Sequence, residues 1–181
     1  MEYWDLYDAN ERPLGRTHRR GEPLPDGAYH LGADVWTVNS RGEILLTLRA
    51  PEKRDLPNEW ENTCGSVLAG ETALAGAVRE LREETGIVAR PEELALLCAY
   101  VDGDTISHSY LLRRDVDAAE IVFQPGETVA ARWVTLAELE AMVARPVGAR
   151  PAGQRLPHVR EKLRALPREG MDAAKSDQNE S

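Results

Sequence analysis

Three glutamates near the middle of the chain have the spacing of a metal site. In the segment from Gly65 to Ile87, an α-helix would place Glu80, Glu83 and Glu84 within about 100° of one another around its axis. Like charges four residues apart destabilise a helix by about 0.2–0.5 kcal/mol per pair, so this stripe favours a compensating cation. Hard divalent ions such as Mg²⁺ take oxygen ligands, and the three carboxylates therefore predict a divalent-metal site.

A solvated charged face is the common alternative for such a stripe, and the wider spacing argues against it. The segment reads G-x5-E-x7-R-E-L-x-E-E-x-G-I, which sets Glu71 and Arg79 at fixed distances from the three acids. Residues of average abundance would produce this pattern at only ~10⁻⁹ of starting points. Arg79 precedes Glu83 by four residues, so it can brace the acids, while Glu71 lies near the expected helix start.

Helices and strands must position these residues. The helix is expected over about 72–85, with Gly86 in the position that commonly ends a helix. Thr135 and Glu138 have the spacing of a capping box, which predicts a second helix, and a last amphipathic helix is expected over 159–166. Strand-like segments occur at 33–38, 44–48, 94–101, 106–113 and 130–134. Runs of strands with inserted helices indicate an α+β or mixed-sheet α/β class.

The segments 33–38 and 44–48 are joined by the turn sequence Asn-Ser-Arg-Gly, so we expect them to form a hairpin. We further expect an N-terminal arm or hairpin over residues 1–29 that packs on a main domain over 30–168. The polar residues 169–181 are expected to be a disordered tail.

The composition narrows the classes of partner. The chain has 181 residues and a net charge of −9, from 22 Lys and Arg against 31 Asp and Glu. This balance argues against binding to nucleic acid or an anionic membrane, and a phosphate-binding protein of this charge must gather cations locally. No apolar run approaches the ~18 residues of a membrane span, and no signal peptide is evident. Two distant cysteines fit the cytoplasm. The choice between monomer and homodimer stays open.

The segment from Gly65 to Ile87 matches the Nudix box at every fixed position, and the chain resembles the Nudix hydrolase family over roughly residues 30–145. This resemblance implies an α/β/α sandwich with a mixed β-sheet and a loop–helix–loop catalytic motif. It also implies an enzyme that uses divalent metal ions to cleave a diphosphate linkage in a small anionic substrate. The expected substrates are nucleoside diphosphate derivatives, nucleotides included.

The resemblance also implies roles for individual residues. Glu80, Glu83 and Glu84 are expected to bind one to three Mg²⁺ or Mn²⁺ ions, joined by a backbone carbonyl of Cys64 or Gly65. Such ions would neutralise the diphosphate and lower the pKa of a bound water.

In the same family the counterparts of Glu71 and Arg79 hold the catalytic loop and orient the acids. A general base often comes from a glutamate before a late strand, where Glu127 lies. A solvated turn acid is the alternative for Glu127, and Glu83 is the competing base.

Candidate substrate contacts lie ahead of the box. Arg49, Lys53 and Arg54 bracket the preceding loop and could supply local positive charge for a phosphate, although simple surface solvation is the alternative. His30 is a candidate substrate contact, with a hydrogen-bonded structural histidine as the alternative.

The N-terminal region resembles type 1 isopentenyl-diphosphate isomerase, which gives an alternative activity. Cys64 stands where that enzyme has its catalytic cysteine. However, Ser66 replaces a metal-ligating histidine, the isomerase Glu-x-Glu pair is missing near 107–109, and the hydrolase box is intact. Cys64 is therefore expected to be a small packed residue. A non-catalytic ligand-sensing domain is a second alternative, for which eroded acids would be more typical.

Overall fold

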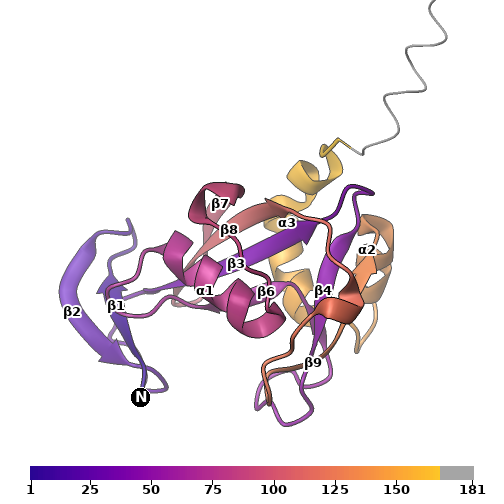
Figure 1. The fold of residues 1–181 in the computed structure, drawn as a ribbon. Helices are drawn as coiled ribbons and strands as arrows, with labels where there is room; N and C mark the ends of the chain where they lie inside the picture. Colours follow the sequence, from indigo (N-terminus) through magenta and orange to yellow (C-terminus); the bar gives the residue numbers. More distant parts are fainter. Residues whose placement is uncertain (168–181) are drawn as a thin grey trace, which may run out of the picture.

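The structure, a computed structural model, describes residues 1–167, and the tail predicted at 169–181 lies outside them. Twelve helices and strands position the site (Figure 1). In chain order they are β1 Tyr3–Tyr7, β2 Pro13–Arg19, β3 His30–Val38, β4 Ile44–Arg49, β5 Trp60–Glu61, β6 Thr63–Ser66, α1 Ala73–Thr85, β7 Leu94–Asp102, β8 Thr105–Arg113, β9 Thr128–Val134, α2 Leu136–Val143 and α3 Arg150–Arg164.

A mixed sheet forms the centre of the molecule. Its strand order is β5-β4-β3-β8-β7, with β6 also paired to β3 and β9 to β4. The central strands β3 and β8 run parallel over their whole length, whereas the other pairings are antiparallel. This arrangement confirms the predicted mixed-sheet α/β class.

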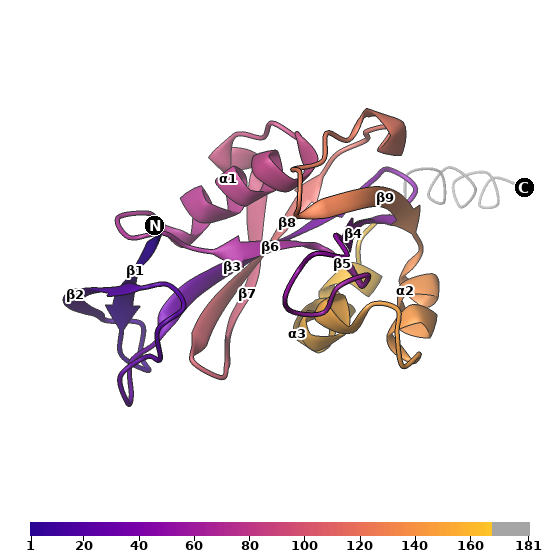
Figure 2. The same cartoon turned by 90° about the horizontal axis from the view of Figure 1, so that it is seen from below.

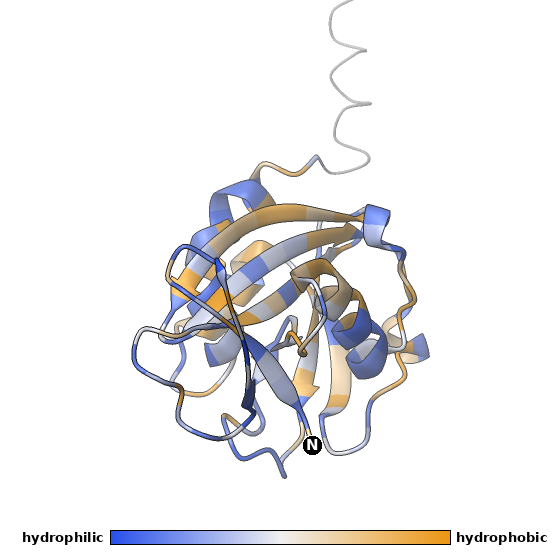
Figure 3. Cartoon of the chain, turned by 90° about the vertical axis from the view of Figure 1, so that its left-hand side faces the viewer, coloured by the Kyte–Doolittle hydropathy of each residue, from blue (hydrophilic) through white to orange (hydrophobic). Residues whose placement is uncertain are grey.

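Helices cover both faces of this sheet. Figure 2 shows α1 on one side and α2 and α3 on the other. Leu81 of α1 packs in one apolar cluster with Val35, and Leu156 of α3 packs in a second cluster with Trp36. Because successive side chains of a strand point to opposite faces, β3 contributes to both clusters, and all nine of its residues are buried. Figure 3 shows the resulting hydrophobic strands beneath more hydrophilic helix surfaces.

Local signals explain the limits of α1, which confirms the predicted helix. The Thr72 side chain accepts a hydrogen bond from the Ala75 amide at 3.2 Å and so caps the first turn. Gly86 ends the helix with φ of 72°, a left-handed conformation that glycine adopts without a side-chain clash. The capping box predicted for α2 is also present, between Thr135 and Glu138.

The predicted hairpin is confirmed, because β3 and β4 pair antiparallel across the turn at residues 39–42, although only Val38 and Ile44 are paired before each strand finds other partners in the sheet. One expectation about the elements needs correction. The last helix begins at Arg150, nine residues before the predicted start at 159. It contains Pro157, a residue that normally marks a helix boundary, and its buried Ala152, Leu156 and Val159 pack against the sheet strongly enough to continue the helix.

The strands β1 and β2 form a separate antiparallel hairpin at one end of the molecule (Figure 1). Leu6 anchors it by burial, and reciprocal backbone hydrogen bonds join Tyr7 to Tyr29. The hairpin also contacts the loop ahead of α1. The Ala69 amide donates to the Tyr3 carbonyl at 2.8 Å, and the Gly70 amide donates to Asp5 Oδ2 at 2.7 Å. The hairpin therefore fixes the outer end of this loop.

Candidate active site

Arg79 is the centre of the hydrogen-bond network on α1. Its Nη1 donates to Glu80 Oε1 at 2.7 Å and to Glu83 Oε2 at 3.1 Å. Its Nη2 donates to the Ser66 carbonyl at 2.9 Å, which ties α1 to β6. The Arg79 guanidinium thus joins Glu80 and Glu83 and fixes the position of their carboxylates.

Glu71 holds Arg79 from the opposite side. Its two carboxylate oxygens accept from Arg79 Nε and Nη2, and one of them also accepts from the Leu68 amide at 3.0 Å. The hydrogen bonds from Arg79 lower the pKa of Glu71, so this carboxylate stays ionised. The structure thus brings Glu71 and Arg79 together, and Glu71 also binds the backbone of the loop after β6.

The Glu80 carboxylate lies directly against the backbone of Gly65. A methyl group at position 65 would overlap the end of the Glu80 side chain, so only glycine leaves this space free. Burial raises the pKa of Glu80, while the hydrogen bond from Arg79, the charge of Arg79 and, more weakly, the charge of Arg20 oppose this rise. The Gly65 backbone therefore forms a cradle for the Glu80 carboxylate.

Glu84 is buried to a degree unusual for an acid, with a relative exposure of 6%. Its Oε2 has no hydrogen-bond partner in the described chain. Burial, followed by the charges of Glu61 and Glu80, raises the pKa of Glu84 well above its ordinary value. An unpaired buried carboxylate is costly, and a cation beside Glu84 would remove that cost.

These observations fit a divalent ion, although the carboxylates are not gathered as ligands in this structure. Within residues 1–167, no group of three or more His, Cys, Asp or Glu side chains is arranged to hold an ion. Glu80 and Glu83 are instead each paired with Arg79. The residues that fit an ion best are Glu84, by its unpaired oxygen, and Glu80, by its cradle on Gly65.

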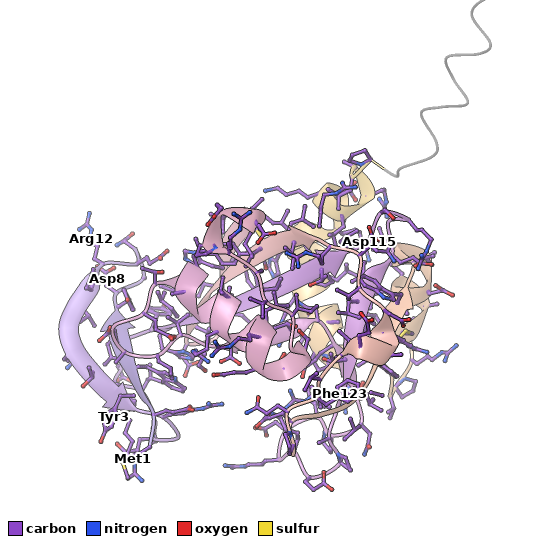
Figure 4. All side chains as sticks on the ribbon, in the orientation of Figure 1. Met1, Tyr3, Asp8, Arg12, Asp115 and Phe123 are labelled. Atoms are coloured by element: carbon purple, nitrogen blue, oxygen red, sulfur yellow. The ribbon has the colours of Figure 1, made fainter. Side chains whose placement is uncertain are left out.

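A cavity of about 100 Å³ opens beside the carboxylates. Glu127 lines it together with Glu80, Glu83 and Glu84, although Glu127 is distant in sequence from the box. Lys53 also lines this cavity and forms an ion pair with Glu127. Figure 4 shows the two sides of this region, with Tyr3 on the hairpin and Phe123 in the segment before β9 on opposite sides of α1.

The other candidate contacts differ in position. Arg49 is largely buried and binds Glu61 at 2.6 Å and the backbone carbonyls of Asp55 and Leu56, so it braces the loop that carries Lys53. Arg54 is exposed and lines neither cavity of the site.

His30 is buried, stacks on Trp4 with ring centroids 3.9 Å apart, and shares a hydrogen bond of 2.9 Å with Thr105. Burial lowers the pKa of His30, although the Leu31 carbonyl and the charge of Asp104 oppose this effect. His30 lines a second cavity, of about 280 Å³, together with Arg49 and Lys53.

Sequence reasoning missed several polar residues around the second cavity. Tyr100 of β7 and Arg155 of α3 line it, and both lie next to the buried Asp34 of β3. Asp34 accepts hydrogen bonds from Ser109 at 2.7 Å and from Asn62 at 3.1 Å. These residues come from β3, β7, β8, α3 and the junction between β5 and β6, with no shared motif. The one available signal was an aspartate inside an apolar strand, a position that requires hydrogen-bond partners.

Comparisons with known sequences place this chain among described relatives. A sequence model of the NUDIX domain matches residues 28–155. An uncharacterized Nudix hydrolase of Listeria monocytogenes is 36% identical over 143 residues, which cover 78% of this chain and 85% of that protein. An isopentenyl-diphosphate Delta-isomerase of Saccharopolyspora erythraea is 36% identical over 97 residues, 53% of this chain and 50% of that protein.

Solved structures share the fold. A crystal structure of a Deinococcus radiodurans protein superposes with a TM-score of 0.73 at 24% identity, covering 88% of this chain and 98% of that one. A bifunctional NMN adenylyltransferase/ADP ribose pyrophosphatase of Francisella tularensis, complexed with AMP and a Mn ion, gives a TM-score of 0.59 at 22% identity, with coverage of 78% and 43%. No helix within residues 1–167 is long and apolar enough to span a membrane.

Proposed function

The chain belongs to the Nudix hydrolase family, which acts on pyrophosphate bonds, and we propose that it is a Mg²⁺-dependent pyrophosphohydrolase of small nucleoside diphosphate derivatives or nucleotides. One observation carries this proposal. Arg79 contacts Glu71, Glu80 and Glu83 at once, so the charged residues of the box are assembled around one guanidinium. A Nudix domain that only senses ligands would not need to keep this set.

Glu80, Glu83 and Glu84 would hold the ion, with the Gly65 carbonyl as a further ligand. The unpaired buried oxygen of Glu84 and the cradle between Glu80 and Gly65 support this assignment. Mn²⁺ has the same preference for oxygen ligands and is expected to substitute. A bound ion would neutralise the diphosphate and lower the pKa of an attacking water.

The chain's own residues would prepare the substrate around that ion. Lys53 contributes positive charge to a cavity otherwise rich in carboxylates, and Arg49 braces the loop on which Lys53 lies. Arg79 and Glu71 are positioning residues, because they act through the carboxylates that they hold. The narrow cavity limits how much water surrounds the reacting phosphorus.

The general base is assigned to Glu127. It lines the cavity together with Glu80, Glu83 and Glu84, so its carboxylate lies where it could accept a proton from an attacking water, and its ion pair with Lys53 holds it in place. Glu83 is the competing candidate. Glu127→Gln should lower kcat by about 10²-fold or more, as expected for the loss of a general base. An unchanged kcat would transfer the role to Glu83.

The isomerase alternative rests on the S. erythraea relative and on Cys64. Burial raises the pKa of Cys64 to about 12, so its thiol is protonated at neutral pH and is a poor nucleophile. The segment 107–109 lies on β8 and presents Ser, His and Ser, with no acid pair. Cys64→Ala should leave hydrolysis within about twofold of the unmodified protein, whereas a loss of all turnover would favour isomerase chemistry.

The proposal is tested by measuring phosphate and nucleotide release with Mg²⁺, with Mn²⁺ and with EDTA. The compounds are nucleoside di- and triphosphates, nucleotide sugars, ADP-ribose, dinucleotides, coenzyme A and isopentenyl diphosphate. Metal-dependent cleavage that Glu84→Gln abolishes is the expected result. Failure to cleave any of these compounds, with the protein folded, would overturn the proposed function. We also propose that the protein works in the cytoplasm, which the two free cysteines support.

A further inference from the structure

Two cavities meet at the catalytic loop. The cavity beside the carboxylates and the larger one next to it share lining residues, namely Arg20, Lys53, Cys64, Gly65 and Ser66. A substrate whose diphosphate lies against Glu80 and Glu84 therefore extends into the larger cavity. The chemistry of that second cavity decides which substrates fit.

The second cavity is lined mainly by polar residues. Its lining includes Tyr100, Ser107 and Gln154, and among residues 1–167 no Val, Leu, Ile, Met, Phe or Trp side chain contributes to it. An isoprenoid chain would leave these donors and acceptors without partners, which disfavours its binding. The cavity therefore favours a group that forms hydrogen bonds.

The lining is also cationic, in a chain whose net charge is −9. Arg20, Arg49, Lys53 and Arg155 contribute to it, against the single carboxylate of Asp102. This cavity is where the protein gathers the positive charge that phosphate binding requires. A group with negative charge of its own would be attracted to it.

The four cations differ in how firmly they are held. Arg49 and Arg155 contact the buried Glu61, at 2.6 and 3.6 Å, and Lys53 is paired with Glu127. Arg20 instead pairs with Glu2, and both of these side chains are about half exposed, 54% and 47%. Because an exposed ion pair contributes little to stability, Arg20 can exchange Glu2 for another anion at little cost.

The backbone around Arg20 is well anchored. The Arg20 amide donates to the Glu2 carbonyl at 3.1 Å at the end of the hairpin, and the hairpin is hydrogen-bonded to the catalytic loop through Ala69 and Gly70. A half-exposed arginine head on an anchored backbone suits recognition of a phosphate, which a guanidinium can bind in a fork.

We propose that Arg20 is a substrate-specificity residue that binds a further phosphate group of the substrate, one additional to the diphosphate that is cleaved. This inference rests on the proposed function and adds to it a substrate class, namely diphosphate compounds that carry another phosphate. The N-terminal hairpin is then a part of the substrate site.

The test uses pairs of compounds that differ by one phosphate: NADPH and NADH, coenzyme A and its 3′-dephospho form, and nucleoside tri- and diphosphates. The proteins are the unmodified chain, Arg20→Ala, Arg20→Lys and Arg19→Ala. Arg19 is the matched control, since it is equally exposed, pairs with Glu22 and lines neither cavity.

For at least one pair, the unmodified protein should prefer the phosphate-rich member by about tenfold or more in kcat/KM. Arg20→Ala should reduce this preference to less than about threefold, through KM and with kcat nearly unchanged. Arg20→Lys should be intermediate because it keeps the charge without the fork. Arg19→Ala should behave like the unmodified protein.

The role of Arg20 would be overturned if the unmodified protein had equal kcat/KM for both members of every pair. It would also be overturned if Arg19→Ala lost the preference to the same extent as Arg20→Ala. If no compound is cleaved, the proposed function fails by itself. Calorimetric binding of the same pairs to the same proteins, with Mg²⁺ present, then decides the role of Arg20 separately. Tighter binding of the phosphate-rich member that is lost in Arg20→Ala would support the proposed role of Arg20. Equal binding of both members by the unmodified protein would reject it.

Discussion

The Arg79 guanidinium and the Glu71 carboxylate meet in a two-pronged contact, with Nε and Nη2 each 2.9 Å from one carboxylate oxygen. The contact joins the loop after β6 to the second turn of α1. Because the same guanidinium contacts Glu80 and Glu83, any change in its shape should move the carboxylates.

Arg79→Lys is therefore expected to lower kcat/KM by about 10- to 100-fold, which is typical for residues that orient metal ligands. A lysine keeps the charge but cannot hold Glu71 and the Ser66 carbonyl at the same time. Steady-state kinetics over a range of Mg²⁺ concentrations would measure the effect. Arg82→Lys, on the exposed face of the same helix, should have wild-type kinetics. Equal losses in both variants would contradict the positioning role.

Gly65→Ala should separate activity from stability. The new methyl group would overlap the end of the Glu80 side chain, which can move aside for about 1 kcal/mol because it is flexible. The displaced carboxylate should lower activity by about 10- to 100-fold. Activity assays and thermal unfolding followed by circular dichroism would measure the two quantities. A variant with full activity would show that the cradle on Gly65 plays no part in placing Glu80.

Glu84→Gln is expected to stabilise the metal-free protein at pH 7 while it abolishes turnover. Burial raises the pKa of Glu84, so the folded state binds a proton more readily than the unfolded state, and ionisation at neutral pH costs stability. Glutamine removes that charge. Urea unfolding in EDTA should give a larger free energy of unfolding for the variant, by about 1 kcal/mol or more. Added Mg²⁺ should stabilise only the unmodified protein. A variant less stable than the unmodified protein would mean that other groups already stabilise the charge of Glu84 when no metal is bound.

The buried His30 should make stability depend on pH. Burial lowers the pKa of His30, so between its folded pKa and the ordinary value near 6.5 the unfolded chain binds more protons. The free energy of unfolding should therefore fall as pH drops below about 6.5. Unfolding curves at several pH values would show this slope, and His30→Gln should flatten it. An unchanged slope in the variant would assign the dependence to other groups.

Much of the fold could be predicted from local signals. Thr72, Gly86 and the pair Thr135 and Glu138 are capping residues whose effect depends on neighbours within a few positions, so the limits of α1 and the start of α2 could be predicted. The start of α3 could not, because Pro157 is a local argument against a helix that tertiary packing overrides. The pairing of β3 with β8 and of β4 with β9 could not be predicted either, because these strands are far apart in the sequence.

The contacts within the site also fall into those that local sequence spacing predicts and those that it does not. The fixed spacing of the box predicted that Arg79 would contact the acids, since these residues share one helix turn. No spacing links Arg20, Tyr100 and Arg155, which come together only when the hairpin, the sheet and α3 pack. Arg49 lay near the site as expected, but its hydrogen bonds to Glu61 and to backbone carbonyls could not be deduced from the sequence.

The hydrogen bond from the Ala69 amide to the Tyr3 carbonyl joins the hairpin to the catalytic loop through main-chain atoms alone. Such a bond persists whatever side chains the hairpin carries. The sequence of β2, almost wholly exposed, is thus free to diverge among descendants of this protein without disturbing the carboxylates on α1. Natural selection could retune what the enzyme accepts at Arg20 while the hydrolytic machinery stays constant.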